Sequence, residues 1–86
     1  MENYIIEENG IYLKDENGKA LAEIEFEKIS NDTYNIYHTF VDDSLRGKGI
    51  ASKLVEAAYD EIVIKRKCKV KATCSYASHW LEKNKK

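Results

Sequence analysis

The sequence predicts an α/β protein in which a mixed sheet begins with antiparallel strands, continues through a β-α-β crossover and ends with a short C-terminal helix. Three features carry this prediction: apolar/acidic alternation over residues 20–27, helical spacing over residues 51–62, and renewed alternation over residues 68–74. Alternation separates side chains onto two faces of a strand, whereas helical spacing gathers them on one face of a helix. With 86 residues, the chain is expected to form a single domain, residues 1–86.

The first strands are predicted from a turn signal and a polarity pattern. Residues 3–8 and 11–15 flank Asn9-Gly10, a dipeptide typical of the tight turn of a β-hairpin. Residues 20–27 follow, with one apolar and one acidic face, as in a sheet that is exposed on one side. The apolar face carries Ala20, Ala22, Ile24 and Phe26, and the acidic face carries Glu23, Glu25 and Glu27.

The second half contains the crossover. Residues 34–41 are apolar or aromatic on both faces, so this strand is expected inside the sheet rather than at its edge. A helix follows, and the basic residues 65–67 suit its C-terminus, where cations offset the helix dipole. The strand at 68–74 should then run parallel to the first through a right-handed connection, and a helix over 76–83 closes the chain. The stripe that buries the crossover helix is Ala51, Leu54, Val55, Ala58 and Ile62.

Composition and charge argue against several classes of function. The net charge of −1 argues against a general nucleic-acid-binding protein. Apolar runs of two or three residues are too short for a membrane span, and the N-terminus does not resemble a signal peptide. Cys68 and Cys74 lack zinc-type spacing, and six strand residues would separate them by about 20 Å, too far for a disulfide. We therefore expect a soluble cytoplasmic protein with reduced thiols, no metal, and a monomeric or weakly dimeric state.

A glycine-containing loop connects the inner strand to the crossover helix. Glycines allow the backbone to approach a ligand and to turn N–H groups toward it, and the helix dipole adds a positive field. Such a loop suits a pyrophosphate; the alternative is an exposed turn that merely starts a helix. The pattern is neither a Walker A sequence nor a dinucleotide fingerprint. The loop and first helical residues are Arg46, Gly47, Lys48, Gly49, Ile50 and Ala51.

The wider segment, residues 38–41 followed by 45–54, resembles the coenzyme A signature of the GNAT acetyltransferase superfamily. In that signature Arg or Gln is followed by two residues, Gly, one residue, and Gly or Ala, which here are Arg46, Gly49 and Ala51. The short chain and the segment 74–76 before an aromatic helix are further similar to small bacterial GNAT-like proteins of the YjdJ type.

This resemblance implies a GNAT-like N-acetyltransferase that transfers an acetyl group from acetyl-coenzyme A to an amine on a small molecule or a protein. Backbone N–H groups of residues 47–51 would hold the pyrophosphate, and the pantetheine arm would pair with Phe40 and Val41 where two strands splay apart. The chain lacks the helices and final strands that usually build the acceptor pocket. The alternative is therefore a non-catalytic acyl-coenzyme A sensor or adaptor.

Three residues are candidate catalytic groups. Cys74 ends the strand beside the expected thioester, where a lowered pKa would make it a nucleophile; the alternative is a small buried cysteine. His38 is expected on one strand face with Ile36 and Phe40, as a base for an amine or for the thiol, or as a hydrogen-bonded core histidine. The resemblance suggests Tyr76 as a general acid near the coenzyme A sulfur, with packing against Trp80 as the alternative.

Overall fold

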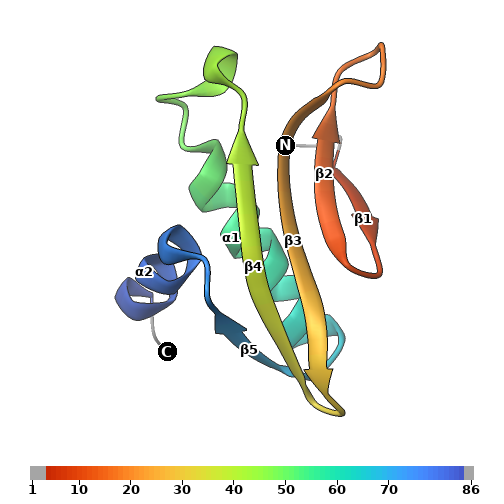
Figure 1. Ribbon diagram of the computed structural model, residues 1–86, viewed down its shortest axis with the longest axis vertical. Helices are drawn as coiled ribbons and strands as arrows, with labels where there is room; N and C mark the ends of the chain where they lie inside the picture. Colours follow the sequence, from red (N-terminus) through yellow and green to blue (C-terminus); the bar gives the residue numbers. More distant parts are fainter. Residues whose placement is uncertain (1–3, 85–86) are drawn as a thin grey trace.

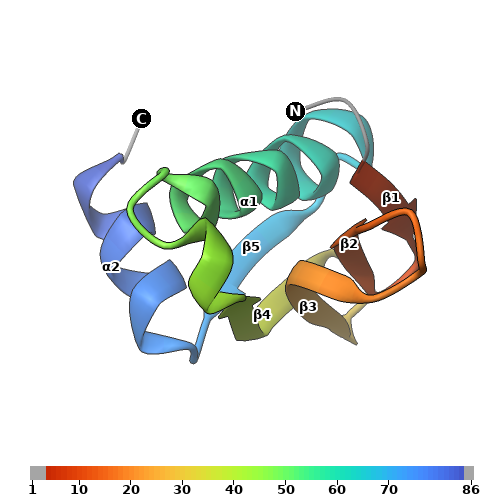
Figure 2. The same ribbon diagram turned by 90° about the horizontal axis from the view of Figure 1, so that it is seen from above.

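The computed structural model describes residues 4–84 and contains one five-stranded sheet with the order β1-β2-β3-β4-β5. Neighbouring strands are antiparallel except for β4 and β5, which are parallel and joined by the crossover helix α1. Helix α1 lies across one face of the sheet, and α2 lies beside it, near β5 (Figures 1 and 2). The predicted fold class is confirmed. The elements are β1 (Tyr4–Glu7), β2 (Gly10–Lys14), β3 (Ala20–Ser30), β4 (Thr33–Val41), α1 (Ile50–Tyr59), β5 (Lys69–Ala72) and α2 (Ser75–Lys83).

The turn of the first hairpin lies one residue earlier than the sequence predicts. Glu7 pairs with Gly10, so the turn residues are Glu8 and Asn9, and Gly10 already belongs to β2. Limited space, rather than turn geometry, favours glycine at this position. A Cβ atom on Gly10 would lie 2.5 Å from the Tyr12 hydroxyl oxygen and 3.0 Å from the carbonyl oxygen of Ile24. The Asn9-Gly10 signal therefore identified the hairpin correctly but misplaced its turn.

The core lies between α1 and the sheet. On β3 the predicted apolar face is buried, with Ala22, Ile24 and Phe26 fully inaccessible to solvent. The helical stripe is buried as predicted, except for Ala51, which is only half-buried. Helix α1 continues through a π-helical turn, Asp60–Lys65, which extends the stripe to Ile62. The fully buried residues of the helical region are Leu54, Val55, Ala58 and Ile62. Within residues 4–84, no helix is long and apolar enough to cross a membrane.

A β-bulge interrupts β4 at Tyr37. Ile36 lies opposite Phe26 on β3, but His38 lies opposite Glu25, the next residue of β3, so two steps along β4 match one step along β3. An extra residue on one strand reverses the alternation of side chains beyond it. Sequence alone gives no sign of this bulge, because it is defined by pairing with another strand.

The bulge changes which side chains of β4 share a face. Beyond it, Thr39 and Val41 lie opposite the buried Ile24 and Ala22 and so face the side covered by α1. His38 and Phe40 instead share the acidic face of β3. The expectation that His38 shares a face with Phe40 is confirmed, and the expectation that it shares a face with Ile36 is wrong.

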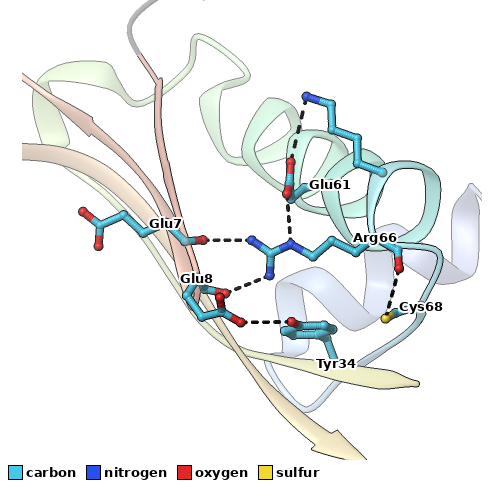
Figure 3. Close-up of polar contacts among 7 residues, drawn as sticks. Glu7, Glu8, Tyr34, Glu61, Arg66 and Cys68 are labelled. Carbon is cyan, nitrogen blue, oxygen red and sulfur yellow. Dashed lines mark hydrogen bonds and ion pairs between the residues drawn. The ribbon is translucent and has the colours of Figure 1, made fainter. Parts of the chain in front are cut away.

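Arg66 ties the end of the helical region to the first hairpin. Its two terminal nitrogens donate to the carbonyl oxygens of Glu8 and Glu7, at 2.8 and 3.0 Å, and its Nε pairs with Glu61 at 2.9 Å (Figure 3). The guanidinium also lies over the ring of Tyr34, 5.2 Å from its centroid. One side chain thus connects the crossover helix, the β1–β2 turn and the central part of the sheet.

Candidate functional site

The loop between β4 and α1 is held in shape by its own hydrogen bonds. The carboxylate of Asp42 accepts from the backbone N–H and the hydroxyl of Ser44, at 3.1 and 2.6 Å, and so caps a 3₁₀ turn, Asp43–Leu45. These bonds from Ser44 lower the pKa of Asp42. The side chain of Arg46 pairs with Asp43 at 2.8 Å, with both groups exposed. The loop therefore reaches α1 in a fixed conformation.

The N-terminus of α1 carries no side-chain cap. The N-cap residue is Gly49, whose backbone is left-handed with φ of 72°, and no side chain accepts the free N–H groups of the first turn. Gly47 also has a positive φ, 82°. A Cβ atom on either glycine would meet nothing within 4 Å, so backbone conformation rather than space favours glycine here. Uncapped N–H groups and the positive end of the helix dipole suit an anion.

A groove of about 470 Å³ joins this helix end to the terminal part of β4. It brings together most of the residues predicted to bind a cofactor, together with Tyr76 from α2. Among the predicted site residues, Lys48, His38 and Cys74 do not line it. The lining residues are Thr39, Phe40, Val41, Leu45, Arg46, Gly47, Gly49, Ile50, Ala51 and Tyr76.

Strands β4 and β5 separate beside this groove. In the described chain they pair only from Thr33 to Ile36 on β4. The N–H groups of Thr73 and Cys74 then both donate to the carbonyl oxygen of Ile36, at 3.0 and 3.2 Å, where the chain turns into α2. The last five residues of β4 consequently have no strand on their β5 side (Figure 1).

Cys74 lies at the start of α2, in the space that β5 leaves open. Its half-buried Sγ lies 3.3 Å from the Thr39 Oγ1. Burial raises the pKa of Cys74, but the Thr39 hydroxyl and the backbone N–H groups of Ala77, Tyr76 and Thr39 have the larger, opposite effect. Together they lower the pKa of Cys74. A lowered pKa increases the fraction of thiolate, the form in which a cysteine acts as a nucleophile.

His38 lies on the other side of the sheet from Thr39. Its Nε2 lies 3.0 Å from an oxygen of Glu23, and the potential ligand atoms of Glu23, Glu25 and His38 lie within 4.8 Å of one another. Both carboxylates already have partners, since Glu25 accepts a hydrogen bond from Tyr12 at 3.0 Å. The cluster is a hydrogen-bonded group on the exposed sheet face, where it could act on protons.

Tyr76 reaches the groove from α2 and is 42% exposed. The ring of Trp80 packs on Tyr59 at 6.3 Å between centroids, and its indole N–H donates to Ser52 at 2.9 Å. Trp80 therefore fastens α2 to α1, and Tyr76 faces the groove.

Comparison with known proteins identifies the family. The family model described as GCN5-related N-acetyltransferase matches residues 10–86, nearly the whole chain. The chain belongs to this family. A GCN5-like protein from Staphylococcus aureus, provisionally assigned as an N-acetyltransferase, has a solution structure with a TM-score of 0.75 and 39% identity; the match covers 96% of this chain and 82% of that one.

Two further relatives of this GNAT chain are more distant or only partly covered. Protein NATD1 of Xenopus tropicalis is 36% identical over 59 residues, which are 69% of this chain and 53% of NATD1. The chain thus spans about half the length of that relative. The ribosomal-protein-alanine N-acetyltransferase of Brucella melitensis biovar Abortus 2308 has a TM-score of 0.61 at 19% identity, over 86% of this chain and 59% of that one. This last likeness shows the shared fold.

Sequence reasoning missed Thr39 as a site residue of this GNAT chain. The residue stands beside Phe40 and Val41, which the resemblance does assign to the groove. Regular alternation from Ile36 would point Thr39 away from the core, so only the bulge reveals its position.

Proposed function

We propose that the chain transfers an acetyl group from acetyl-coenzyme A to an amine. The observation that carries this proposal is one groove containing both the uncapped N-terminus of α1 and the unpaired edge of β4. An uncapped helix end suits a phosphate anion, and an unpaired strand edge suits a ligand with amide groups. A coenzyme A molecule carries both kinds of group.

The groove residues fit this ligand in chemistry as well as in arrangement. Backbone N–H groups of residues 47–51 would hold the pyrophosphate, with Arg46 adding positive charge in the groove. The backbone of Phe40 and Val41 would bind the amide groups of the pantetheine arm. When bound, the ligand supplies a thioester, whose acyl carbon is open to attack by a nucleophile.

We further propose a covalent route through Cys74. The thiolate would attack the acyl carbon, the bond to the coenzyme A sulfur would break, and that sulfur would leave with a proton. The acceptor amine would then attack the acyl group on Cys74, form the amide and return the sulfur to its thiolate. Two steps of this kind are easier than one difficult transfer when the nucleophile is already activated. Tyr76, in the groove, is positioned to donate the proton to the departing sulfur.

His38 is proposed as the base that takes the proton from the amine. It lies on the uncovered face of the sheet, on the opposite side of β4 from the Thr39–Cys74 contact. Its Nε2 lies 3.0 Å from a carboxylate oxygen of Glu23, a contact that orients the ring. This position excludes direct deprotonation of Cys74, and a proton from an amine that attacks the acyl group on Cys74 would reach His38 only through bound water. The acceptor, a small molecule or a protein, would have to reach the acyl group in the gap between β4 and β5.

Cofactor binding is tested by thermal melting of three glycine variants. A ligand bound only to the folded chain at 100 times its Kd raises the stability by about 2.7 kcal/mol. We expect this shift for the natural chain, and its loss in Gly49→Asp, because a carboxylate at the helix end repels the pyrophosphate. Gly49→Asn has the same shape without the charge. Gly18→Asp is the matched control, since Gly18 has φ of 84° and open surroundings but lies in another turn.

A turnover assay distinguishes an acetyltransferase from a non-catalytic acyl-coenzyme A sensor. With acetyl-coenzyme A and a panel of amines, the natural chain and Cys68→Ala should release free thiol and carry one acetyl group on Cys74 before the amine is added. Cys74→Ala should lose the adduct and the turnover. Retained turnover in Cys74→Ala would mean direct transfer, and binding without turnover on any amine would favour the acyl-coenzyme A sensor or adaptor. No melting shift in the natural chain would refute the proposal itself.

A further inference from the structure

The bulge in β4 places Thr39, and not His38, beside Cys74. In a regular strand, residues 36, 38 and 40 would share the core face and Thr39 would point away from it. The extra residue at position 37 reverses this order, so Thr39 turns toward the side covered by α1. It lines the groove, and its Oγ1 lies 3.3 Å from Cys74 Sγ.

Cys74 receives contacts from two directions. From α2, the N–H groups of Tyr76 and Ala77 contribute to the lowered pKa of Cys74, although its side chain forms no capping hydrogen bond with the helix. From β4, the Thr39 hydroxyl and its backbone N–H approach the same atom. The backbone donors would remain after any substitution of a side chain. The Thr39 hydroxyl is the one of these donors that depends on residue type.

We propose that Thr39 is a positioning residue, whose hydroxyl holds the Cys74 sulfur in the gap and donates a hydrogen bond to its thiolate form. This inference rests on the covalent route proposed above. While Cys74 is a thiol, either the Thr39 hydroxyl or the thiol can be the hydrogen-bond donor. Once the thiolate forms, only the hydroxyl can donate, so the bond favours the charged state. A β-branched residue also suits this site, because its side chain has few accessible rotamers.

The inference is tested by alkylation of Cys74 with iodoacetamide as a function of pH, in a Cys68→Ala background where Cys74 is the remaining thiol. The rate follows the fraction of thiolate. Thr39→Val removes the hydroxyl and keeps the branched shape, and Thr39→Ser keeps the hydroxyl. A hydrogen bond to a charged group corresponds to an upward shift of about one pH unit in the Thr39→Val profile. The profile of Thr39→Ser should differ from that of the parent by no more than about a third of a pH unit.

Several outcomes would overturn the inference. The hydroxyl has no role if the pH profile of alkylation in Thr39→Val matches that of the parent. It also has no role if the profile of Thr39→Ser shifts as far as that of Thr39→Val. Thr39→Ala, which also lacks the hydroxyl, should match Thr39→Val, and melting curves verify that each variant is folded. The alkylation assay needs no coenzyme A, so its result is independent of the proposed function. A chain that forms no acetyl adduct on Cys74 refutes the covalent route, whereas an unchanged alkylation profile refutes the role of Thr39.

Discussion

Replacing Arg66 with alanine should remove a large part of the folding free energy. Its side chain is only 20% exposed and its partner Glu61 14% exposed, so this is a largely buried ion pair. Removing one partner of a buried pair costs about 3–5 kcal/mol, because the other charge is left without compensation. Lys65 lies 3.9 Å from Glu61 and offsets part of that cost. The lost contacts with aromatic rings add about 1 kcal/mol.

These contributions amount to about 4–5 kcal/mol for Arg66→Ala. A domain of this length has a total stability of about 4–13 kcal/mol, so the variant loses a substantial fraction of it. At about 4–8 °C per kcal/mol, the Tm should fall by about 15 °C or more. Thermal melting followed by circular dichroism measures this change directly.

Lys65→Ala provides the matched control, because Lys65 is adjacent in sequence and approaches the same carboxylate. Its side chain is 67% exposed and its Nζ lies at 3.9 Å, so the loss should stay below about 0.5 kcal/mol. Arg66→Lys keeps the charge but cannot reach both carbonyl oxygens with a planar fork, so it should recover less than half of the lost stability. Should Arg66→Ala and Lys65→Ala melt within about 3 °C of each other, the contacts of Figure 3 do not stabilise the fold as argued.

Two further changes test backbone conformation and proton linkage. Lys67 has a positive φ of 59°, so Lys67→Gly should stabilise the chain by about 0.5–1 kcal/mol in urea unfolding, and an unchanged or lowered midpoint would contradict this strain. Partial burial and the hydrogen bond to Glu25 raise the pKa of Tyr12 to about 12. Above pH 10 the unfolded chain loses this proton first, so stability falls as pH rises from 10 to 12. Tyr12→Phe should lose less stability over that range, and equal losses would refute the linkage.

The strands and the crossover were predictable because their signals are local. Alternation on β3 and helical spacing on α1 depend on residues close in sequence, and each period can be read without knowing the partner surface. The loop before α1 was predictable for a similar reason. Gly47 and Gly49 both adopt the left-handed backbone conformation that glycine favours, directly before the predicted helix.

Contacts between distant residues were not predictable in the same way. Residues 65–67 read as a basic helix end, and all three have the same charge and similar length. The structure separates them completely: Arg66 is a nearly buried link to a carbonyl 58 residues away, whereas Lys65 is an exposed partner of Glu61. Which of the three turns inward depends on the helical phase at the end of the π-helical turn and on the position of the first hairpin.

The bulge in β4 is the feature that the sequence conceals and that most affects the chemistry. Without it, the regular alternation would aim His38 toward the core and Thr39 toward the open face. With it, Thr39 meets Cys74 on one side of the strand, and His38 meets Glu23 on the other. In the covalent route proposed above, this one strand would therefore supply two groups of different chemistry. The Thr39 hydroxyl would stabilise the thiolate of Cys74, and the His38 imidazole would accept a proton from an amine.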